Sequence, residues 1–559
     1  MERRERLVNV GVLACGLLAA IWLGRVFLLN PVDRIHINHE GFTYAGRLLE
    51  FREQLAAGYL VPQWCTSFRG GLGSAQFCYY QPGFFYVASL VPWSVPAVRA
   101  LGVAVAVFAL LGYLATYALI RPRFGRLAGW LGASSLLLSV YAATNICIRG
   151  DLSEFSAMML LPAVLWALAG WLEQGRLKYA AWLAPAAAAT ILLHPIVGMI
   201  GFVLLAAALI AFLLETRDYR RVGVAALVLA VAIGMAAFYW LPVFLEWDLV
   251  NTDGAFVGHF FYANHFINPL KLLGFHYRQK GGVPLSLGLL LVSTAGFNSL
   301  VCYYRRRELS APQRRLVVFS LLAILGFVLM MTRASAFVWQ LVTPLQRMQF
   351  PWRILTVVTV LTAVVAGASL PWRSEKRRAA AAALLITAMW TLSIHYTAYG
   401  LWPNVRVPQT IDELTQIYFA PDAKNEWVPR GAVLDIPKAY RKSPVAGPGC
   451  QVDDFRRQAR RLSCQVRTAQ ATTLVLPHYY FPVGWQTTLD GQPVPLAADP
   501  RGLMRLDLPA GAEGRLQVVF TQTPMHRLGL VVSGVSCLVG AVWLAAAALR
   551  RRHRPSAVL

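Results

Sequence analysis

The chain has 559 residues, of which 57% are hydrophobic and only 14% are charged, and its net charge is +25. This composition is typical of a protein embedded in a lipid bilayer and excludes an ordinary soluble protein of this length. The positive charge does not indicate nucleic-acid binding, because 24 of the Lys and Arg residues lie in short gaps between long apolar segments. Those gaps are residues 1–7, 121–126, 173–178, 217–221, 304–315, 372–378 and 550–554.

The gaps alternate between Arg-rich and Arg-poor along the chain. Because Lys and Arg concentrate in cytoplasmic loops, the Arg-rich gaps predict the cytoplasmic side, and both termini fall on it. We therefore expect a multi-pass protein of the bacterial inner membrane. The first apolar run is long and lacks a small-residue cleavage site, which favours an uncleaved helix over a signal peptide.

Segments of about 20 apolar residues predict an all-α polytopic membrane bundle of about twelve transmembrane helices. The fifth and sixth are separated only by His194 and Pro195, so we expect a tight hairpin there. In chain order the segments are 8–29, 97–120, 127–145, 155–172, 179–193, 196–214, 222–246, 284–303, 315–332, 353–371, 378–397 and 526–549.

The first segment expected outside the membrane is residues 30–96, on the Arg-poor side. Within it, EGFTYAGRLLEFREQLAAGY has the apolar spacing of an amphipathic helix lying on the bilayer surface. Residues 82–96 are apolar but short and bounded by prolines, so we expect them to be re-entrant or interfacial. Together with the first eleven helices, this loop belongs to a transmembrane module of residues 1–397.

The second outer segment, residues 398–525, is expected to form a small, mainly-β periplasmic domain. Its alternating pattern predicts strands from Thr472 onward, after helical or irregular structure, with hairpin turns at Asp490-Gly491 and Pro509-Ala510-Gly511. Residues 526–559 then form the last helix and a basic cytoplasmic tail. Two disulfides are possible in an oxidising periplasm, Cys450–Cys464 and Cys65–Cys78.

Glu40, in HINHEGFTYAGR, is a first candidate for chemistry on the Arg-poor side. A carboxylate there could deprotonate an acceptor hydroxyl or help to hold a divalent cation, Mg²⁺ or Mn²⁺. The alternative is a charge at the start of a helix, stabilised by the helix dipole.

The turn Arg149-Gly-Asp151-Leu-Ser-Glu154 lies on the same side and supplies a second acidic position. Glu154 could converge with Glu40 on one cation or one acceptor. Ordinary helix capping explains Asp151 well, with Glu154 in the first turn, but it leaves Arg149 without a role.

Arginines at the outer entry of the tenth helix, Arg347 and Arg353, oppose the orientation rule and therefore need a reason. Binding a phosphate or diphosphate is a suitable one, and snorkelling beside Trp352 is the alternative. His194 could contact the same phosphate or could be a hydrogen-bonded histidine between two helices.

The order of these motifs resembles the bacterial membrane proteins labelled as related to 6-pyruvoyl-tetrahydropterin synthase, which are similar to the GT-C glycosyltransferase superfamily. The resemblance covers most of the chain. The motifs that carry it are GYLVPQW, FRGGLGSAQFCYYQPGFFY, RGDLSEF, LLHP and RMQFPWR.

That resemblance implies a polyprenyl-phosphate sugar donor, a glycan, lipid or protein acceptor, and transfer at the outer membrane face. It implies that Glu40 and Glu154 are the acidic catalytic or metal-binding positions, with Asp33 as the nearest substitute because Asp is more usual where this chain has Glu in HEG. It also implies that the donor phosphate is bound by arginines and a histidine, the candidates being Arg149, Arg347, Arg353 and His194.

Other classes of function also fit twelve helices: a transporter or flippase for lipid-linked glycans, a glycan polymerase or ligase, and a non-catalytic envelope assembly protein. Against transport, the two halves of the chain show no repeat symmetry, since the soluble mass lies between the eleventh and twelfth helices. The early acidic loop favours the glycosyltransferase over the polymerase or ligase.

Overall fold

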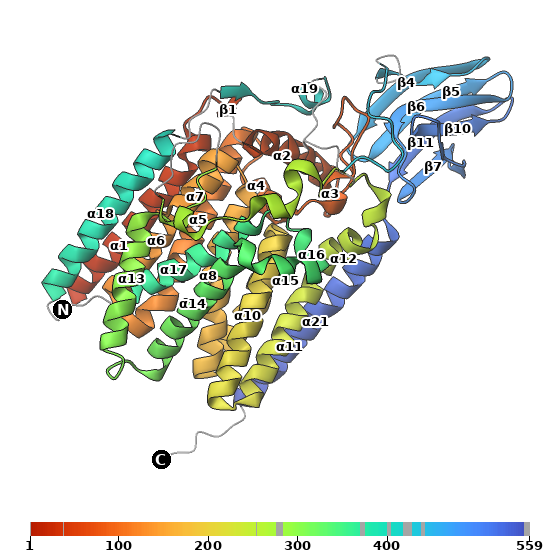
Figure 1. Cartoon of the computed structure of the whole chain (residues 1–559). Coiled ribbons are helices and arrows are strands. Elements are labelled where there is room, and N and C mark those ends of the chain that lie inside the picture. The colour runs from red at the N-terminus through yellow and green to blue at the C-terminus, as the bar shows by residue number, and fades with distance from the viewer. Residues whose placement is uncertain are drawn as a thin grey trace.

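The computed structural model describes residues 2–36, 39–252, 254–274, 283–368, 375–399, 404–416, 427–437 and 442–552. A bundle of long helices carries a β domain at one end, which lies at the upper right in Figure 1. Helix α1 (Glu2–Leu28) begins, and α21 (Pro524–Arg552) ends, at the opposite end of the bundle. Both termini of the chain therefore lie on the same side of the bundle, as the alternating Arg-rich gaps predict.

Each of the twelve predicted membrane segments contains a helix. Among the described residues, seven helices are long and apolar enough to cross a membrane, or eight if the pair α11–α12, bent by 69°, is one span. The number of crossings therefore stays a prediction. Besides α1 and α21, the long or apolar helices are α5 (Ala97–Phe124), α6 (Arg126–Leu137), α8 (Leu152–Gln174), α9 (Leu177–Leu193), α10 (Pro195–Thr216), α11 (Tyr219–Met235), α12 (Ala237–Leu245), α13 (Leu289–Tyr304), α14 (Ala311–Met330), α17 (Leu355–Gly367) and α18 (Glu375–Tyr399).

Helix α17 forms the centre of the bundle, since every one of its residues is buried. A helix that is apolar on all sides is expected in such a position. It approaches α6 closely, because a Cβ on Gly367 would lie 2.8 Å from the Cα of Gly132. Small residues at such crossings let helix backbones pack directly in a membrane.

The helix α2 (Gly41–Ala56) occurs where the sequence predicts an amphipathic helix, but the expectation that it lies on the bilayer surface is wrong. Its apolar side, including Tyr44 and Leu48, is buried, and so is its polar side, including Arg47, Glu50 and Gln54. Protein covers both faces. Below it, α4 (Gly83–Ser89) has only seven residues and is too short to span, as predicted for residues 82–96.

The β domain is a sandwich of two sheets. The first has the strand order β3-β6-β10-β9 and the second β4-β5-β11-β7-β8. Leucines and valines from both sheets form the core between them. The strands are β3 (Val445–Ala446), β4 (Cys450–Gln458), β5 (Arg461–Thr468), β6 (Thr472–Tyr479), β7 (Trp485–Leu489), β8 (Gln492–Pro493), β9 (Ala497–Ala498), β10 (Leu503–Leu508) and β11 (Glu513–Phe520).

Two details of the predicted β domain need correction. The strands begin at Val445 rather than at Thr472, since the charged pattern of β4 hides its alternation. The turn at residues 509–511 joins two different sheets and is not a hairpin, whereas Asp490-Gly491 is the expected hairpin turn, with φ values of 45° and 84°.

The sequence left a Cys450–Cys464 disulfide possible, and in the structure both thiols are free. Cys450 lies opposite Thr468 in the β4–β5 ladder. Thr468 is four residues beyond Cys464, which is about 13 Å along a strand and far beyond the reach of a disulfide. Cys65 and Cys78 are likewise free.

Arg460, at the β4–β5 turn, fastens the β domain to the helix α2. Its guanidinium donates to Gln54 Oε1 at 2.8 Å and to Gln63 Oε1 at 3.2 Å. Nearby, Trp64 donates to Nε2 of His478 at 2.7 Å. Burial lowers the pKa of His478 to about 3, so the ring is neutral and accepts this bond.

A short ladder joins the helices α1 and α18 at their β-domain ends. Strand β1 (Arg34–His36) follows α1, and β2 (Asn404–Arg406) follows α18. The two strands pair antiparallel, with Ile35 opposite Val405. Next to them lies the short helix α19 (Ile411–Gln416).

Candidate functional site

Segments far apart in the sequence meet at the end of the bundle that carries the β domain. They bring together Glu40, Arg149, Asp151, Glu154, His194 and Arg353, which we call the acid–arginine cluster. Backbone hydrogen bonds fasten two of these segments to each other, since the N–H of Glu40 donates to the carbonyl of Arg149 at 2.9 Å.

The turn before α8 positions three of these side chains. A π-helical turn, η1 (Asn145–Arg149), ends at Gly150, whose φ of 66° favours glycine. Asp151 then caps α8 by accepting the N–H of Glu154 at 3.0 Å, as the capping interpretation predicts. Capping is not its whole role, because Asp151 Oδ2 also lies 3.2 Å from Arg149.

Glu154 is the centre of the cluster and is fully buried. Its Oε1 lies 2.7 Å from Arg149 Nη1 and accepts from the hydroxyls of Tyr141 at 2.7 Å and Thr356 at 3.1 Å. Its Oε2 lies 3.5 Å from Arg353 Nε. Neither Glu154 Oε2 nor Arg353 Nε makes a hydrogen bond with a described residue. Buried polar atoms without such a partner call for an explanation.

Arg353 enters the cluster from the short helix η7 (Pro351–Ile354), directly before α17. Its Nη1 donates to the carbonyl of Met348 at 3.0 Å. Arg149 stacks over the ring of Trp352 at 4.7 Å. The aromatic ring that the snorkelling interpretation assigns to the interface therefore packs against an arginine of the cluster.

His194 ends α9 and caps α10, its ring accepting the N–H of Val197 at 3.3 Å while Pro195 begins the helix. The predicted hairpin is confirmed. The other ring nitrogen of His194 lies 3.9 Å from Asp151 Oδ2. The histidine therefore connects the hairpin to the carboxylates of the cluster.

Glu40 is the accessible carboxylate of the cluster. Its side chain is 40% exposed and lies 3.9 Å from Arg47, whereas the side chains of Asp151 and Glu154 are 4% and 0% exposed. Surrounding protein and the charge of Asp151 raise the pKa of Glu40, and neighbouring arginines oppose that rise.

Two predicted site residues lie outside the cluster. Asp33 precedes β1, is about as exposed as Glu40, and forms its ion pair with Arg34 at 3.9 Å. Arg347 is exposed, and it forms no ion pair with a described carboxylate. Because Arg353 is buried and Arg347 is not, only one of the two arginines in RMQFPWR faces the acidic group.

Sequence reasoning missed several polar side chains that complete the site. Tyr141 and Thr356 hold Glu154, as described above. Tyr44 links Asp151, at 3.4 Å, to Tyr80, at 3.1 Å, which in turn accepts from Arg47 at 2.9 Å. Tyrosine and threonine are common in membrane helices, so no local pattern marked them.

Asp151, Glu154 and His194 each offer a ligand atom, and these atoms lie within 4.8 Å of one another. Carboxylate oxygens suit Mg²⁺ and Mn²⁺, and imidazole suits transition metals. The hydrogen-bond-free Oε2 of Glu154 also fits a cation. Arg149 already contacts the carboxylates of Asp151 and Glu154, so a cation must share them with that arginine. Glu40 is not among the three residues whose ligand atoms lie this close together.

Comparison of the sequence with known protein families gives one match. A family model described as "6-pyruvoyl-tetrahydropterin synthase related domain; membrane protein" matches residues 77–401. No curated protein matches the chain.

Solved structures are similar only at low identity. Arabinofuranosyltransferase AftD from Mycobacteria is 18% identical with a TM-score of 0.44, over 77% of this chain and 28% of that one. Oligosaccharyltransferase AglB from Archaeoglobus fulgidus, in complex with an inhibitory peptide and a dolichol-phosphate, is 16% identical with a TM-score of 0.43, over 72% and 57%. ArnT from Cupriavidus metallidurans is 14% identical with a TM-score of 0.41, over 75% and 78%. The chain thus spans 28% of AftD and 57% of AglB, and overlap at these TM-scores is not evidence for a shared activity.

Proposed function

The chain belongs to the membrane-protein family described as 6-pyruvoyl-tetrahydropterin synthase related, and we propose that it is a glycosyltransferase that takes a sugar from a polyprenyl-phosphate donor. The acceptor is a hydroxyl group of a glycan, lipid or protein. We place the reaction at the β-domain end of the bundle, on the periplasmic face of the bacterial inner membrane.

One observation carries this proposal: two buried arginines converge on one buried glutamate beside a half-exposed carboxylate, at the end of a membrane bundle. Arg149 and Arg353 both face Glu154. Ionisable groups at such a depth are expensive to keep and are functional in most membrane proteins. Guanidinium groups bind phosphate with paired hydrogen bonds, and a phosphate is the group that a polyprenyl-phosphate donor presents at the membrane surface.

In the proposed reaction, Glu40 takes the proton of the acceptor hydroxyl. The acceptor oxygen forms a bond to the anomeric carbon of the sugar, and the bond from that carbon to the donor phosphate oxygen breaks. The polyprenyl phosphate leaves with the electron pair, and Arg149 and Arg353 stabilise its charge. Glu154 holds the two arginines in place, and is a positioning residue.

A divalent cation fits the donor types of Asp151, Glu154 and His194, which are the residues that would hold it. When bound, it would neutralise the phosphate. The proton transfer and the binding of the phosphate are assigned to groups of the chain itself, because Glu40 is the most exposed carboxylate of the cluster and Arg149 and Arg353 supply the guanidinium groups.

The test is product formation by the purified protein in vesicles that contain a polyprenyl-phosphate sugar, with and without Mn²⁺. Glu40→Gln keeps the shape but removes the basicity, so turnover should fall by about two to four orders of magnitude. Asp33→Asn is the matched comparison, since its carboxylate is similarly exposed at 42%. Loss of product in Asp33→Asn with normal product in Glu40→Gln would assign the base to Asp33 instead. Normal product in both would contradict the proposed mechanism.

A further inference from the structure

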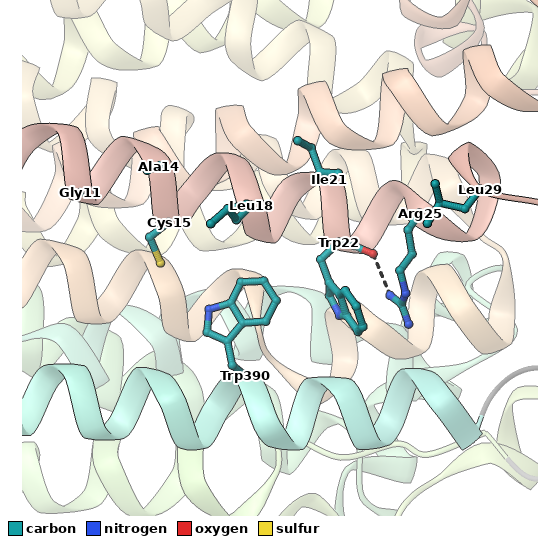
Figure 2. A pocket seen from close by; sticks show the side chains of 9 residues that line it. All are labelled: Gly11, Ala14, Cys15, Leu18, Ile21, Trp22, Arg25, Leu29 and Trp390. Atoms are coloured by element: carbon teal, nitrogen blue, oxygen red, sulfur yellow. Dashed lines mark hydrogen bonds between the residues drawn. The ribbon is translucent and has the colours of Figure 1, made fainter.

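An apolar groove of about 600 Å³ runs along the outside of the bundle between α1 and α18 (Figure 2). Cys15, Trp22 and Arg25 project from α1 toward α18, and Trp390 projects from α18 toward α1. The helix α18 packs against α6 and the short helix α7 (Val140–Thr144) rather than closely against α1. The rings of Trp22 and Trp390 approach to 6.1 Å and bridge the gap between the two helices.

The groove extends along most of the depth of a membrane. Its lining runs from Gly11 on α1 to Leu29, directly after the end of that helix, which corresponds to about 27 Å at the rise of an α-helix. The hydrocarbon core of a bilayer is about 30 Å thick. The groove therefore faces lipid, and a hydrocarbon chain rather than water is the chemistry that fills it.

The exception to this apolar lining is Arg25, near the β-domain end of the groove. Its guanidinium stacks over the ring of Trp22, 3.4 Å from the centroid, and one N–H donates to the carbonyl of Trp22 at 2.7 Å. No described carboxylate forms an ion pair with it. The carbonyl of Trp22 takes one N–H of Arg25, and a phosphate can accept the remaining N–H groups as a bidentate partner.

We propose that the groove is a binding site for one anionic glycerophospholipid, with an acyl chain along α1 and the headgroup phosphate at Arg25. A phospholipid is the occupant that this position favours, because it is the solvent of the outer surface of the bundle and competes by mass action. The arginines that we assign to the sugar donor, Arg149 and Arg353, lie in the buried cluster, and Arg25 makes no contact with either. The proposal is independent of the glycosyltransferase activity.

The bound lipid would fill the gap between α1 and α18, which the protein itself bridges only in part. Above the groove, β1 and β2 pair and join the ends of the two helices. Within the membrane, Trp22 and Trp390 contact each other across the gap. A lipid between α1 and α18 would fix α1, and with it the strand β1 that follows the helix.

The test is retention of phosphatidylglycerol by the full-length protein. The protein is reconstituted in vesicles of phosphatidylcholine with an equal share of phosphatidylglycerol, extracted in detergent, and weighed by native mass spectrometry. We expect about one retained phosphatidylglycerol. Arg25→Gln should weaken retention at least about tenfold, because a charged hydrogen-bond pair is lost.

A second pair of variants keeps the proposal testable if Arg25→Gln folds poorly. Leu18→Trp fills the groove and should also abolish retention. Leu17→Trp adds the same bulk to a residue of α1 that is 46% exposed and does not line the groove, and it should retain the lipid. Equal retention by wild type, Arg25→Gln and Leu18→Trp would overturn the site. Displacement of phosphatidylglycerol by an equal amount of isoprenoid phosphate would overturn the choice of occupant in favour of the lipid carrier.

Discussion

Replacing Glu154 with Gln removes one negative charge from the acid–arginine cluster while it nearly preserves the shape of the side chain. The amide oxygen can still accept from the hydroxyls of Tyr141 and Thr356, now at 2.7 and 3.1 Å. The contacts to Arg149 at 2.7 Å and Arg353 at 3.5 Å lose their charge. The variant therefore isolates the electrostatic contribution of Glu154.

The expected loss of stability follows from the burial of the partners. Removing one member of a buried ion pair costs about 3 to 5 kcal/mol, because an uncompensated charge stays behind. Arg149 keeps Asp151 at 3.2 Å, so we expect a value near the lower end, and Arg353 is the charge left alone. Glu154→Gln combined with Arg353→Gln should therefore cost less than the two single variants added, by about 1 to 3 kcal/mol.

The assay is unfolding of the purified protein in detergent, followed by tryptophan fluorescence, together with product formation. Glu173→Gln is the matched control. Glu173 lies 2.7 Å from Arg123, the same distance as Glu154 from Arg149, and this ion pair is at the opposite end of the bundle, in the Arg-rich gaps. That control should lower stability by a smaller amount and leave product formation unchanged. If Glu154→Gln is as stable as wild type, or if the double variant is no better than additive, the three charges are not coupled as the contacts indicate.

Two further predictions concern Glu50 and the orientation of the chain. Burial, and then the charge of Glu53, raise the pKa of Glu50 to about 8. Between the ordinary pKa of a glutamate and pH 8, the folded protein therefore holds a proton that the unfolded chain releases. The free energy of unfolding should fall by up to about 5 kcal/mol as pH rises through that window. Thermal unfolding from pH 5 to pH 9 measures this slope, and Glu50→Gln should flatten it; an unchanged slope would assign the dependence to another group. For orientation, Ser310→Cys, expected in the cytoplasm, should react with a membrane-impermeant thiol reagent only in opened vesicles. Gln470→Cys, expected in the periplasm, should react in intact cells stripped of the outer membrane. The opposite pattern would invert the proposed orientation.

Much of the helical architecture could be predicted from the sequence, because twenty apolar residues in succession leave few alternatives to a helix in a membrane. The tight turn at His194 and Pro195 was accessible for the same reason, since proline begins helices well. The 69° bend between α11 and α12 was not. Continuous apolar sequence marks a span, but it does not say where the span changes direction.

The misplacement of α2 has a different cause. Its alternation of apolar and charged residues is that of a helix at a water–lipid boundary. In the folded chain the polar side of α2 meets other parts of the protein. Gln54 accepts from Arg460 of the β domain, and the carboxyl group of Glu50 accepts the N–H groups of Thr66 and Ser67. A pattern read along one helix cannot distinguish water from a polar protein partner four hundred residues away.

The same limit explains which site residues were found. Charged side chains on the Arg-poor side stand out because they contradict the apolar background, and Glu40, Arg149, Glu154 and Arg353 were identified for that reason. Thr356 was not, although it holds Glu154 across 202 residues of sequence. Arg347 carried the same signal as Arg353, and only the turn of the backbone into η7 separates the buried arginine from the exposed one.

The contacts of α2 connect the β domain to the proposed catalytic carboxylate. The helix begins at Gly41, directly after Glu40, and its far end is fastened to the β domain through Gln54 and Arg460. On the membrane side, the N–H of Glu40 bonds to the carbonyl of Arg149. Glu40 thus lies between two rigid attachments, one to each part of the protein. A carboxylate held in this way keeps its distance from the arginines that we propose to bind the donor, while the β domain beside it is the part of the protein that we expect to present the acceptor.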